Sequence, residues 1–292
     1  MNALMNAPQA PAASGLRRCA PAESEFAFCS ADFERVRRLV FQRAGISLGP
    51  GKQALVYSRL SRRLRETGQH SFSAYLLRLE HSSGPAAEPE WRAFVDCLTT
   101  NQTSFFRDEH HFATLACELE RRAGERLRIW CSAASTGEEP YSIAIACAEA
   151  PGGAPRVRIV ATDIDTRVLA TASRGVYPAE VRGLSRERLQ QHFLRGKGLD
   201  SGFVRVKPEL ARRLEFRPLN MAEAYWSLGE PFDFVFCRHV TTDFTAGIQR
   251  RLLAGIHAAM NPGGLLFASP GDDFGDVSDL FRLRGKAVYE RA

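Results

Sequence analysis

One short stretch constrains the fold of this chain more than any other: a small-residue turn that joins a strand to a helix within residues 127–147. An apolar run at 127–130 indicates a buried strand, and a second apolar run at 143–147 indicates a buried helix. The turn between them contains one glycine, Gly137, followed by two glutamates. A strand, a tight turn and a helix in this order are typical of doubly wound sheets, where the backbone approaches a ligand at the carboxyl end of a strand.

The residues around this turn predict the kind of ligand. A second strand predicted at 158–162 ends in Asp163, and an acidic side chain at that place holds the hydroxyl groups of a ribose. Three glycines that would hug a pyrophosphate are absent, and Glu138 and Glu139 would repel a phosphate. They suit a cationic ligand, such as the ammonium and sulfonium groups of S-adenosylmethionine. The alternative is an ordinary solvated helix N-terminus, where acidic residues are common.

Length and composition limit the class of protein. At 292 residues the chain is long enough for one α/β domain and a smaller one, and 45% hydrophobic and 25% charged residues are ordinary for a globular protein. No apolar run is long enough to span a membrane. Residues 1–24 are rich in alanine and proline without an apolar signal core, so we predict a disordered leader. The seven cysteines are scattered without a CxxC pair, which favours the reducing cytoplasm.

A small all-α domain is predicted for residues 25–100. Its second helical pattern carries an apolar stripe at 56–64, and Lys52, Arg59 and Arg63 share a narrow arc beside that stripe. With a net charge of +6, this arc suits an acidic protein partner, and we expect its three cations not to be needed for the fold. No aromatic side chains lie between them to stack on bases, so a nucleic-acid partner is not predicted.

Residues 101–292 alternate strands with helices, which predicts a mostly parallel sheet. The predicted strands are 127–131, 158–162, 214–217, 232–237, 263–268 and 285–290. Between about 178 and 214 the pattern changes, because 203–206 alternates like a half-exposed strand and 195–198 supplies turn residues. We predict a small antiparallel β insertion at this place.

The loop between the two predicted domains contains a candidate site residue. Phe105 and Phe106 would anchor this loop in a core and hold Arg107 in a fixed place. The alternative is that Arg107 simply pairs with Asp108 or with a surface acid.

Two further candidates follow predicted strands. Asn220 has an amide suited to a base or ribose edge, or it is an ordinary turn asparagine. His239 is a general base, a hydrogen-bond partner or a surface histidine. A lone histidine does not indicate a metal, so no metal site is predicted.

Together these motifs resemble the CheR-type chemotaxis receptor methyltransferases over residues 32–290. The segments that carry the resemblance are 57–65 (YSRLSRRLR), 98–107 (LTTNQTSFFR), 135–142 (STGEEPYS), 162–165 (TDID), 193–196 (FLRG) and 236–238 (FCR). The resemblance implies an α/β fold: a doubly wound sheet like that of S-adenosylmethionine-dependent methyltransferases, with a small antiparallel β insertion and a preceding all-α domain. It implies a protein-glutamate O-methyltransferase that methylates glutamates on the cytoplasmic helices of chemotaxis receptors and releases S-adenosylhomocysteine.

The resemblance also implies roles for particular residues. The positions at which the family contacts S-adenosylmethionine are Asn101, Thr103, Arg107, Glu138, Asp163, Asn220, Met221, Cys237 and Arg238. Lys52, Arg59 and Arg63 match basic residues that face the acidic methylation helix of the receptor. The β insertion matches a subdomain that in some members captures the C-terminal peptide of a receptor. The expected partner is the cytoplasmic domain of a methyl-accepting receptor, with no nucleic acid and no membrane insertion, and the chain is expected to be a cytoplasmic monomer.

The chain departs from the family pattern at the substrate half of the site. His239 replaces an asparagine, Asp243 replaces an active-site tyrosine, and 269–272 (SPGD) replaces a Gly-His-Ser-Glu turn. Arg107 and Asp243 are the expected catalytic positions, with Arg107 orienting a carboxylate or the cofactor. A carboxylate at 243 would repel an incoming glutamate by about 4 kcal/mol at 4 Å and an effective dielectric of 20. The alternative functions are a cofactor-binding relative with weakened or redirected catalysis that acts as a regulatory module, and a methyltransferase for another substrate.

Overall fold

The fold is described by a computed structural model for residues 25–99, 101–151, 156–240, 244–269, 271–272 and 277–292. The predicted leader at 1–24 and the predicted catalytic residue Asp243 lie outside the described residues. Within the described part of the chain, no helix is both long and apolar enough to cross a bilayer.

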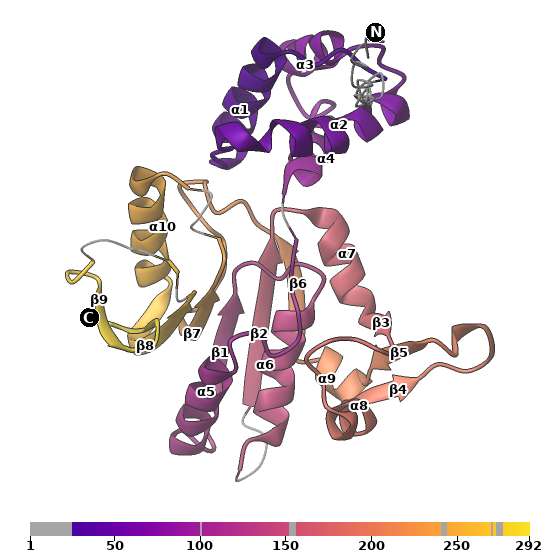
Figure 1. The fold of residues 1–292 in the computed structure, drawn as a ribbon. Helices are drawn as coiled ribbons and strands as arrows, with labels where there is room; N and C mark the ends of the chain where they lie inside the picture. Colours follow the sequence, from indigo (N-terminus) through magenta and orange to yellow (C-terminus); the bar gives the residue numbers. More distant parts are fainter. Residues whose placement is uncertain (1–24, 100, 152–155, 241–243, 270, 273–276) are drawn as a thin grey trace, which may run out of the picture.

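Helices α1 to α4 pack together at one end of the molecule (Figure 1). Their bounds are α1 Ser30–Ala44, α2 Gln53–Thr67, α3 Phe72–His81 and α4 Glu88–Leu98, and a 3-10 turn, η1, covers Pro50–Lys52. Each helix turns its apolar stripe inward, and Val36, Leu60, Leu76 and Phe94 are completely buried. This layer has its own core, separate from the core of the sheet.

The central sheet has the strand order β6-β2-β1-β7-β8-β10-β9 among the described residues. The strand bounds are β1 Arg126–Cys131, β2 Arg156–Asp163, β6 Leu214–Pro218, β7 Phe232–Cys237, β8 Met260–Ala268, β9 Phe281–Gly285 and β10 Val288–Arg291. The first five in the order run parallel, and β10 and β9 are antiparallel to their neighbours. The chain runs outward from β1 to β2 and β6 and then returns to β7, so the order reverses between β1 and β7. A crevice for a ligand is expected at the carboxyl ends of those strands.

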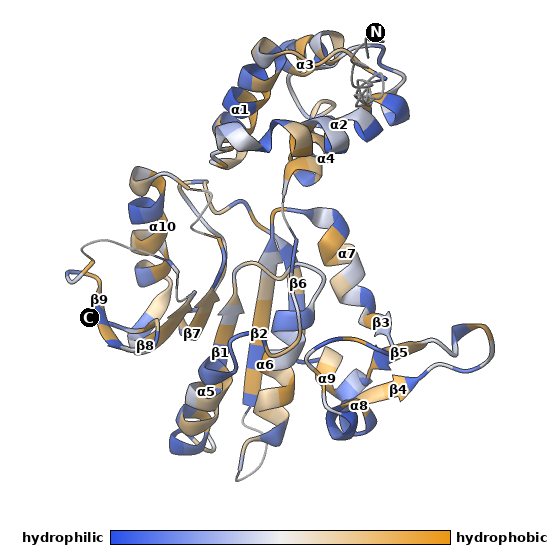
Figure 2. Ribbon diagram, viewed as in Figure 1, coloured by the Kyte–Doolittle hydropathy of each residue, from blue (hydrophilic) through white to orange (hydrophobic). Residues whose placement is uncertain are grey.

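Helices cover both faces of this sheet (Figure 1). Helices α5 (Glu109–Arg121) and α6 (Glu138–Glu149) pack on one face, and α10 (Ala246–Ala258) packs on the other. The strands of the sheet are largely hydrophobic, whereas the helices alternate hydrophobic and hydrophilic faces (Figure 2). Helix α6 is the exception, because Tyr141 and residues 143–147 are all buried. It therefore fixes the turn that precedes it.

The inserted subdomain projects from one side of the sheet (Figure 1). It contains a three-stranded antiparallel sheet in the order β3-β5-β4. Its elements are β3 Val176–Pro178, α8 Arg186–His192, β4 Phe193–Arg195, η2 Gly198–Asp200, β5 Phe203–Val206 and α9 Pro208–Ala211, and α7 (Thr166–Arg174) connects it to β2. The predicted antiparallel insertion and the predicted fold class are confirmed.

Two local predictions are wrong. The single strand predicted at 285–290 is a hairpin, in which Lys286 and Ala287 have φ angles of 48° and 59° between β9 and β10. The apolar alternation continues through this turn, so the sequence pattern conceals it. The second wrong prediction concerns Lys52, which is predicted on the same helical arc as Arg59 and Arg63. It ends η1 and precedes the first residue of α2.

Candidate cofactor site

The turn between β1 and α6 forms the floor of the candidate site. Ala134 donates its backbone N–H to the carbonyl of Thr162 at 2.9 Å, which ties the turn to the end of β2. Gly137 has a φ of 103°, and a Cβ there would lie 2.5 Å from the hydroxyl oxygen of Tyr177. Glycine is needed here both for its backbone conformation and for close packing on the inserted subdomain.

Asp163 lies at the carboxyl end of β2 and is buried. One carboxylate oxygen accepts the N–H of Ser135 at 2.8 Å, and the other accepts the N–H of Asp165 at 2.9 Å. Burial raises the pKa of Asp163 to about 6, although these backbone hydrogen bonds oppose the rise. Each carboxylate oxygen retains a second lone pair, so the side chain can still accept from the hydroxyl groups of a ribose.

A cavity lies next to Asp163, at the carboxyl ends of β1, β2, β6 and β7. Four of the predicted cofactor residues line it: Asn101, Asp163, Asn220 and Met221. His239 lines the same cavity, together with Ser132 and Ala133 at the start of the turn. The apolar part of the wall is formed by Ala44, Ile46, Leu98, Ile164, Leu219, Val240 and Phe244. This donor set suits a nucleoside, because polar groups can bind the ribose and base edges while the apolar wall contacts the ring. The cavity has a volume of about 110 Å³, so such a ligand would extend beyond it.

The cavity lies between the helical layer and the sheet, which the sequence did not indicate. Ala44, Ile46 and Leu98 come from the helical layer. A hydrogen bond of 2.9 Å from Asn220 Nδ2 to the carbonyl of Arg43 connects the two parts beside the cavity. Apolar residues at helix ends carry no signal for a ligand, so sequence reasoning could not find this wall.

Both asparagines of the cavity also make internal hydrogen bonds. Asn101 Nδ2 donates to Oδ2 of Asp165 at 2.9 Å, and Thr99 Oγ1 donates to the same oxygen at 3.1 Å. Asn220 Oδ1 accepts the N–H of Ala222 at 3.0 Å, which is the geometry of a turn asparagine. Asn220 is therefore a turn asparagine whose amide lies at the cavity wall, so the two roles considered for it from the sequence are compatible.

The two adjacent glutamates have different surroundings. Glu138 accepts a hydrogen bond from Thr136 Oγ1 at 2.6 Å, and burial raises its pKa. Glu139 is buried and accepts from Nε of Arg238 at 2.7 Å. The expectation that both carboxylates face a cationic ligand is wrong for Glu139, because Arg238 already neutralises it. Glu138 does not line the cavity described above, so its contact with a ligand stays a prediction.

Arg238 and Cys237 lie behind the cavity wall. Arg238 is 4% exposed and donates to the carbonyl of Arg107 at 2.6 Å as well as to Glu139. Cys237 is completely buried, and burial raises the pKa of its thiol to about 12. Neither side chain lines the cavity, so the structure gives both residues a supporting position.

The loop that carries Thr103 and Arg107 is anchored as expected. Phe105 and Phe106 are buried, and the N–H of Phe106 donates to Ser142 Oγ at 2.9 Å. Arg107 Nη1 donates to the carbonyl of Gln102 at 3.2 Å and forms no ion pair with another described residue. The alternative pairing of Arg107 with Asp108 does not occur, because Asp108 lies 3.6 Å from Arg238 Nη1 instead.

His239 is held in one orientation at the edge of the cavity. Its φ is 57°, and its N–H donates to Ser269 Oγ at 2.8 Å while Nδ1 lies 3.0 Å from the same oxygen. The Ser269 hydroxyl thus holds both the backbone and the ring of His239, and Nε2 on the other side of the ring lies 3.6 Å from Oδ2 of Asp108. Burial lowers the pKa of His239, and the charges of Arg107 and Arg238 add to this effect. The ring is therefore neutral at pH 7. Sequence reasoning missed the role of Ser269, whose only signal was its place in a segment that departs from the family pattern.

The three cations predicted to meet a partner are not equivalent. Arg59 Nη1 donates to the carbonyls of Leu98 and Thr99 at 3.0 and 2.8 Å. Arg63 pairs with Glu90 at 2.6 Å, and this bond raises the pKa of the guanidinium. Lys52 is exposed. The expectation that these cations have no part in the fold is thus wrong for Arg59 and Arg63.

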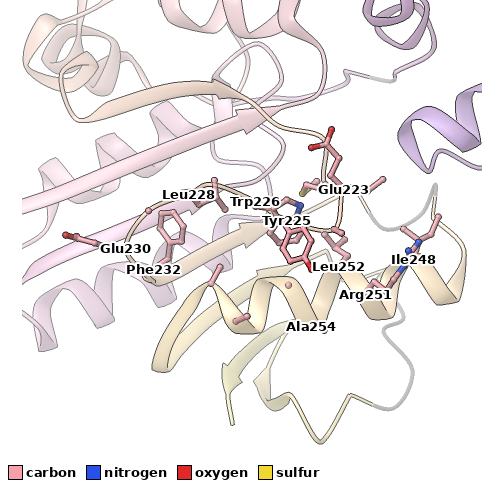
Figure 3. Close-up of a pocket in the computed structure, with 17 residues that line it drawn as sticks. Glu223, Tyr225, Trp226, Leu228, Glu230, Phe232, Ile248, Arg251, Leu252 and Ala254 are labelled. Atoms are coloured by element: carbon pink, nitrogen blue, oxygen red, sulfur yellow. The ribbon is translucent and has the colours of Figure 1, made fainter. Parts of the chain in front are cut away.

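A second cavity lies between residues 221–230 and α10, with a volume of about 540 Å³ (Figure 3). The ring of Trp226 closes its inner side, and a Cβ on Gly255 would approach this ring to 2.7 Å. Met221 is the only predicted cofactor residue in its lining. This cavity therefore does not gather the predicted site, and the first one does. Among the described residues, no group of three or more histidine, cysteine and acidic side chains could hold a metal ion.

Comparison with known proteins agrees with this geometry. Residues 101–289 match the family model described as the CheR methyltransferase SAM binding domain, and residues 31–99 match the CheR methyltransferase all-alpha domain. The chain belongs to the CheR methyltransferase family. The chemotaxis protein methyltransferase of Klebsiella aerogenes is 47% identical over 89% of this chain and 89% of its own length. Those of Salmonella typhimurium and Escherichia coli are 46% and 44% identical, each over 90% of this chain and 91% of its own length.

Family membership confirms the predicted resemblance and the predicted cofactor. The SAM binding model covers the turn before α6, Asp163, Asn220 and the end of β7, which together surround the first cavity. The CheR domain of this chain is therefore an S-adenosylmethionine-binding methyltransferase domain. The cofactor contacts of the individual residues stay predictions, supported for Asn101, Asp163, Asn220 and Met221 by their place in the lining.

Proposed function

We propose that this chain transfers the methyl group of S-adenosylmethionine to glutamate side chains on the cytoplasmic helices of chemotaxis receptors. The relatives at 44–47% identity are named chemotaxis protein methyltransferases. The single observation that carries the proposal is the meeting of Asp163, Asn220 and His239 on one cavity at the point where the strand order reverses.

The chemistry of this transfer makes modest demands on the protein. A glutamate carboxylate has an ordinary pKa of about 4.3, so it is already a nucleophile at neutral pH and needs no general base. The bound cofactor supplies an electrophilic methyl group on a sulfonium. The residues of the chain then have to hold the carboxylate oxygen in line with that methyl group and to exclude water, so positioning and electrostatics dominate.

The surroundings of the cavity support particular roles. Asp163 and Asn220 would bind the nucleoside through the free lone pairs and N–H of their side chains. Arg107, on the anchored loop at 101–108, would attract and orient the incoming carboxylate. Burial lowers the pKa of His239, so its uncharged form predominates at pH 7. Its Nε2 lies 3.6 Å from Oδ2 of Asp108, and in the tautomer that is protonated there it would donate to a carboxylate without a proton transfer.

We also propose how the chain engages its receptor. Lys52 is exposed beside α2 and would meet the acidic methylation helix, with Arg59 and Arg63 adding positive potential from their internal positions. Strand β4 is an edge of the small sheet. Leu194 on β4 is 48% exposed, and Phe203 on the neighbouring strand β5 is 45% exposed. That edge would capture a C-terminal peptide of a receptor by strand addition. We expect the chain to act as a monomer in the cytoplasm.

The deciding experiment is incubation of the full chain with methyl-labelled S-adenosylmethionine and a receptor cytoplasmic fragment. We expect label on the fragment that is lost by mild alkaline hydrolysis, as for a glutamate ester. A fragment with its methylation glutamates replaced by alanine is the matched control and should stay unlabelled. Tight cofactor binding without label on any fragment would favour the regulatory module instead.

A further inference from the structure

A hollow lined by arginines shares no residue with the cofactor cavity. It has a volume of about 620 Å³ and lies at the amino-terminal halves of β1 and β2, beside β6 and the segment at 228–230. Its charged lining consists of Arg126, Arg128, Arg156, Arg158, Arg212, Arg213, Arg217, Glu215 and Glu230. Seven arginines against two glutamates leave a strong positive charge, and none of the described residues that line the hollow is a lysine or an aromatic residue.

Strand register places these arginines side by side. Arg126 lies opposite Arg156, and Arg128 lies opposite Arg158, in the parallel pairing of β1 with β2. Neighbouring strands are about 4.8 Å apart, so each pair sets two like charges next to each other on one face of the sheet. Such pairs are destabilising on their own. The arrangement therefore favours an anion that lies between them.

The face is open because the crossover from β6 to β7 contains no helix at residues 219–231. The neighbouring half of this face is covered by Trp226 and α10, which pack on Trp130. Hydrophilic residues interrupt the otherwise hydrophobic strand β2 near its amino-terminal end (Figure 2). These exposed residues are Arg156 and Arg158.

Some of the arginines are fixed and others are available. Arg128 donates to the carbonyls of Leu228 and Glu230, and its guanidinium lies 4.6 Å from the ring centre of Phe232. The side chains of Arg126, Arg156 and Arg158 form no hydrogen bond or ion pair with any residue that the structure describes, and only the charge of Arg158 acts on Glu215, which pairs with Arg217. The hollow thus combines a rigid wall with three guanidinium groups that form no direct ion pair within the described residues.

We propose that this arginine hollow binds a compact ligand that carries at least two phosphate groups. Guanidinium groups bind phosphate oxygens in pairs with matching geometry, and the absence of lysine fits such recognition. The volume lies within the range of small-molecule sites, about 300–1,000 Å³. A recessed site fits a compact anion better than a flat membrane surface, and the missing aromatic platform argues against single-stranded nucleic acid. The site goes beyond the proposed function and does not depend on it, since it shares no lining residue with the cofactor cavity.

The proposal is tested by calorimetry on the full chain with inorganic tripolyphosphate at low ionic strength, with and without saturating S-adenosylhomocysteine. We expect one tripolyphosphate to bind per chain in both conditions. A chain that binds tripolyphosphate but not S-adenosylhomocysteine would contradict only the nucleoside site, and the reverse result would contradict only the arginine hollow. The double variant Arg156→Gln/Arg158→Gln should bind tripolyphosphate at least about tenfold more weakly. The matched control is Arg182→Gln/Arg186→Gln, which removes two exposed arginines of the inserted subdomain and should bind like the wild type.

The same measurements distinguish tripolyphosphate from other anionic ligands and from a purely structural role of the arginines. Binding of poly-L-glutamate or phosphatidylglycerol vesicles, but not of tripolyphosphate, would overturn the proposal, as would equal losses in the two double variants. Thermal unfolding at low salt provides a second measurement, because removing like-charge neighbours should leave the Arg156→Gln/Arg158→Gln variant at least as stable as the wild type. A large loss of stability in that variant would show that the arginines serve the fold instead.

Discussion

The Nε of Arg238 donates to Oε2 of Glu139 at 2.7 Å, between the end of β7 and the first turn of α6. Their side chains are 2% and 10% exposed, so the pair is almost completely removed from water. The same guanidinium donates to the carbonyl of Arg107, which belongs to the loop at the edge of the cofactor cavity. One ion pair therefore holds together three segments that surround the candidate site.

Breaking this pair should destabilise the fold. Arg238→Met leaves the carboxylate of Glu139 buried without its partner, and we expect a loss of about 3–5 kcal/mol in the free energy of unfolding. Urea unfolding measures this loss. The double variant Glu139→Gln/Arg238→Met should be less destabilised than the sum of the two single variants, because both charges are then absent. Strict additivity would contradict the assigned pairing.

The sequence predicts the fold better than the details of the site. Gly137 and Asp163 could be found because the doubly wound sheet needs a tight turn and an acidic side chain at fixed places. Arg238 and Glu139 could not be distinguished from ligand contacts, because a sequence pattern does not show which of two adjacent carboxylates turns inward. The roles of Ala44 and Ser269 depend on the packing of distant segments, which no local pattern contains.

Asp163 should make cofactor affinity depend on pH. Its pKa of about 6 means that the carboxylate is ionised at pH 7.5 and largely protonated at pH 5. Since ribose hydroxyls donate to the ionised form, we expect S-adenosylhomocysteine to bind about tenfold more weakly at pH 5 than at pH 7.5. Asp163→Asn should lose about 1.5–3 kcal/mol of binding at pH 7.5 and show little pH dependence. Calorimetry measures the affinity and its pH dependence. The control is Glu215→Gln, which changes an exposed acid outside the cavity and should bind like the wild type. An unchanged affinity in Asp163→Asn would show that Asp163 does not contact the cofactor.

The same group should affect the ligand-free protein in the opposite direction. The folded pKa of Asp163 lies above its ordinary value of 3.8, so the folded state holds this proton more tightly than the unfolded state. The ionised, buried carboxylate destabilises the fold, and this effect is fully present above pH 6. It is lost as the carboxylate takes up a proton between pH 6 and pH 4, so the stability of the fold rises over this range. We therefore expect the wild type to gain stability relative to ligand-free Asp163→Asn as pH falls from 7.5 to 4, as measured by urea unfolding. The amide that replaces one carboxylate oxygen cannot accept the N–H of Ser135 or Asp165, so the variant also carries a loss that does not depend on pH. Asp96, whose pKa is also raised to about 6 by burial, contributes the same trend to both proteins and cancels in the comparison.

The basic residues near α2 should separate folding from receptor binding. Arg63→Ala removes the partner of Glu90, whose carboxylate also accepts from the hydroxyl of Tyr75 at 2.9 Å, so we expect a loss of about 1–3 kcal/mol in stability. Lys52→Glu changes only an exposed charge and should leave the melting temperature nearly unchanged. It should nevertheless weaken association with a receptor fragment, most strongly at low salt. The proposed surface is rejected if Lys52→Glu binds the fragment normally at every salt concentration.

The edge strand β4 offers a test of peptide capture. Leu194 is 48% exposed on that strand, and the cleft beside it is lined by Arg195, Phe203 and Arg205. Leu194→Asp should weaken binding of a peptide from the C-terminus of the receptor while leaving S-adenosylhomocysteine affinity unchanged, because the two sites share no residue. Fluorescence anisotropy of a labelled peptide measures the effect. The matched control is Leu283→Asp on β9, another exposed leucine on an edge strand of the central sheet.

The last prediction concerns the positions at which the chain departs from its family. His239 has a φ of 57°, which asparagine adopts readily, and its N–H bond to Ser269 does not depend on the side chain. The double variant His239→Asn/Asp243→Tyr should therefore fold normally and keep its affinity for S-adenosylmethionine. If the carboxylate of Asp243 faces the incoming glutamate, its removal relieves a repulsion between like charges, and methylation of a receptor fragment should rise. The single variant His239→Asn separates the two contributions, since it keeps the acid at 243. A fall in methylation in the double variant, with cofactor affinity unchanged, would show instead that His239 and Asp243 form a working site of different construction.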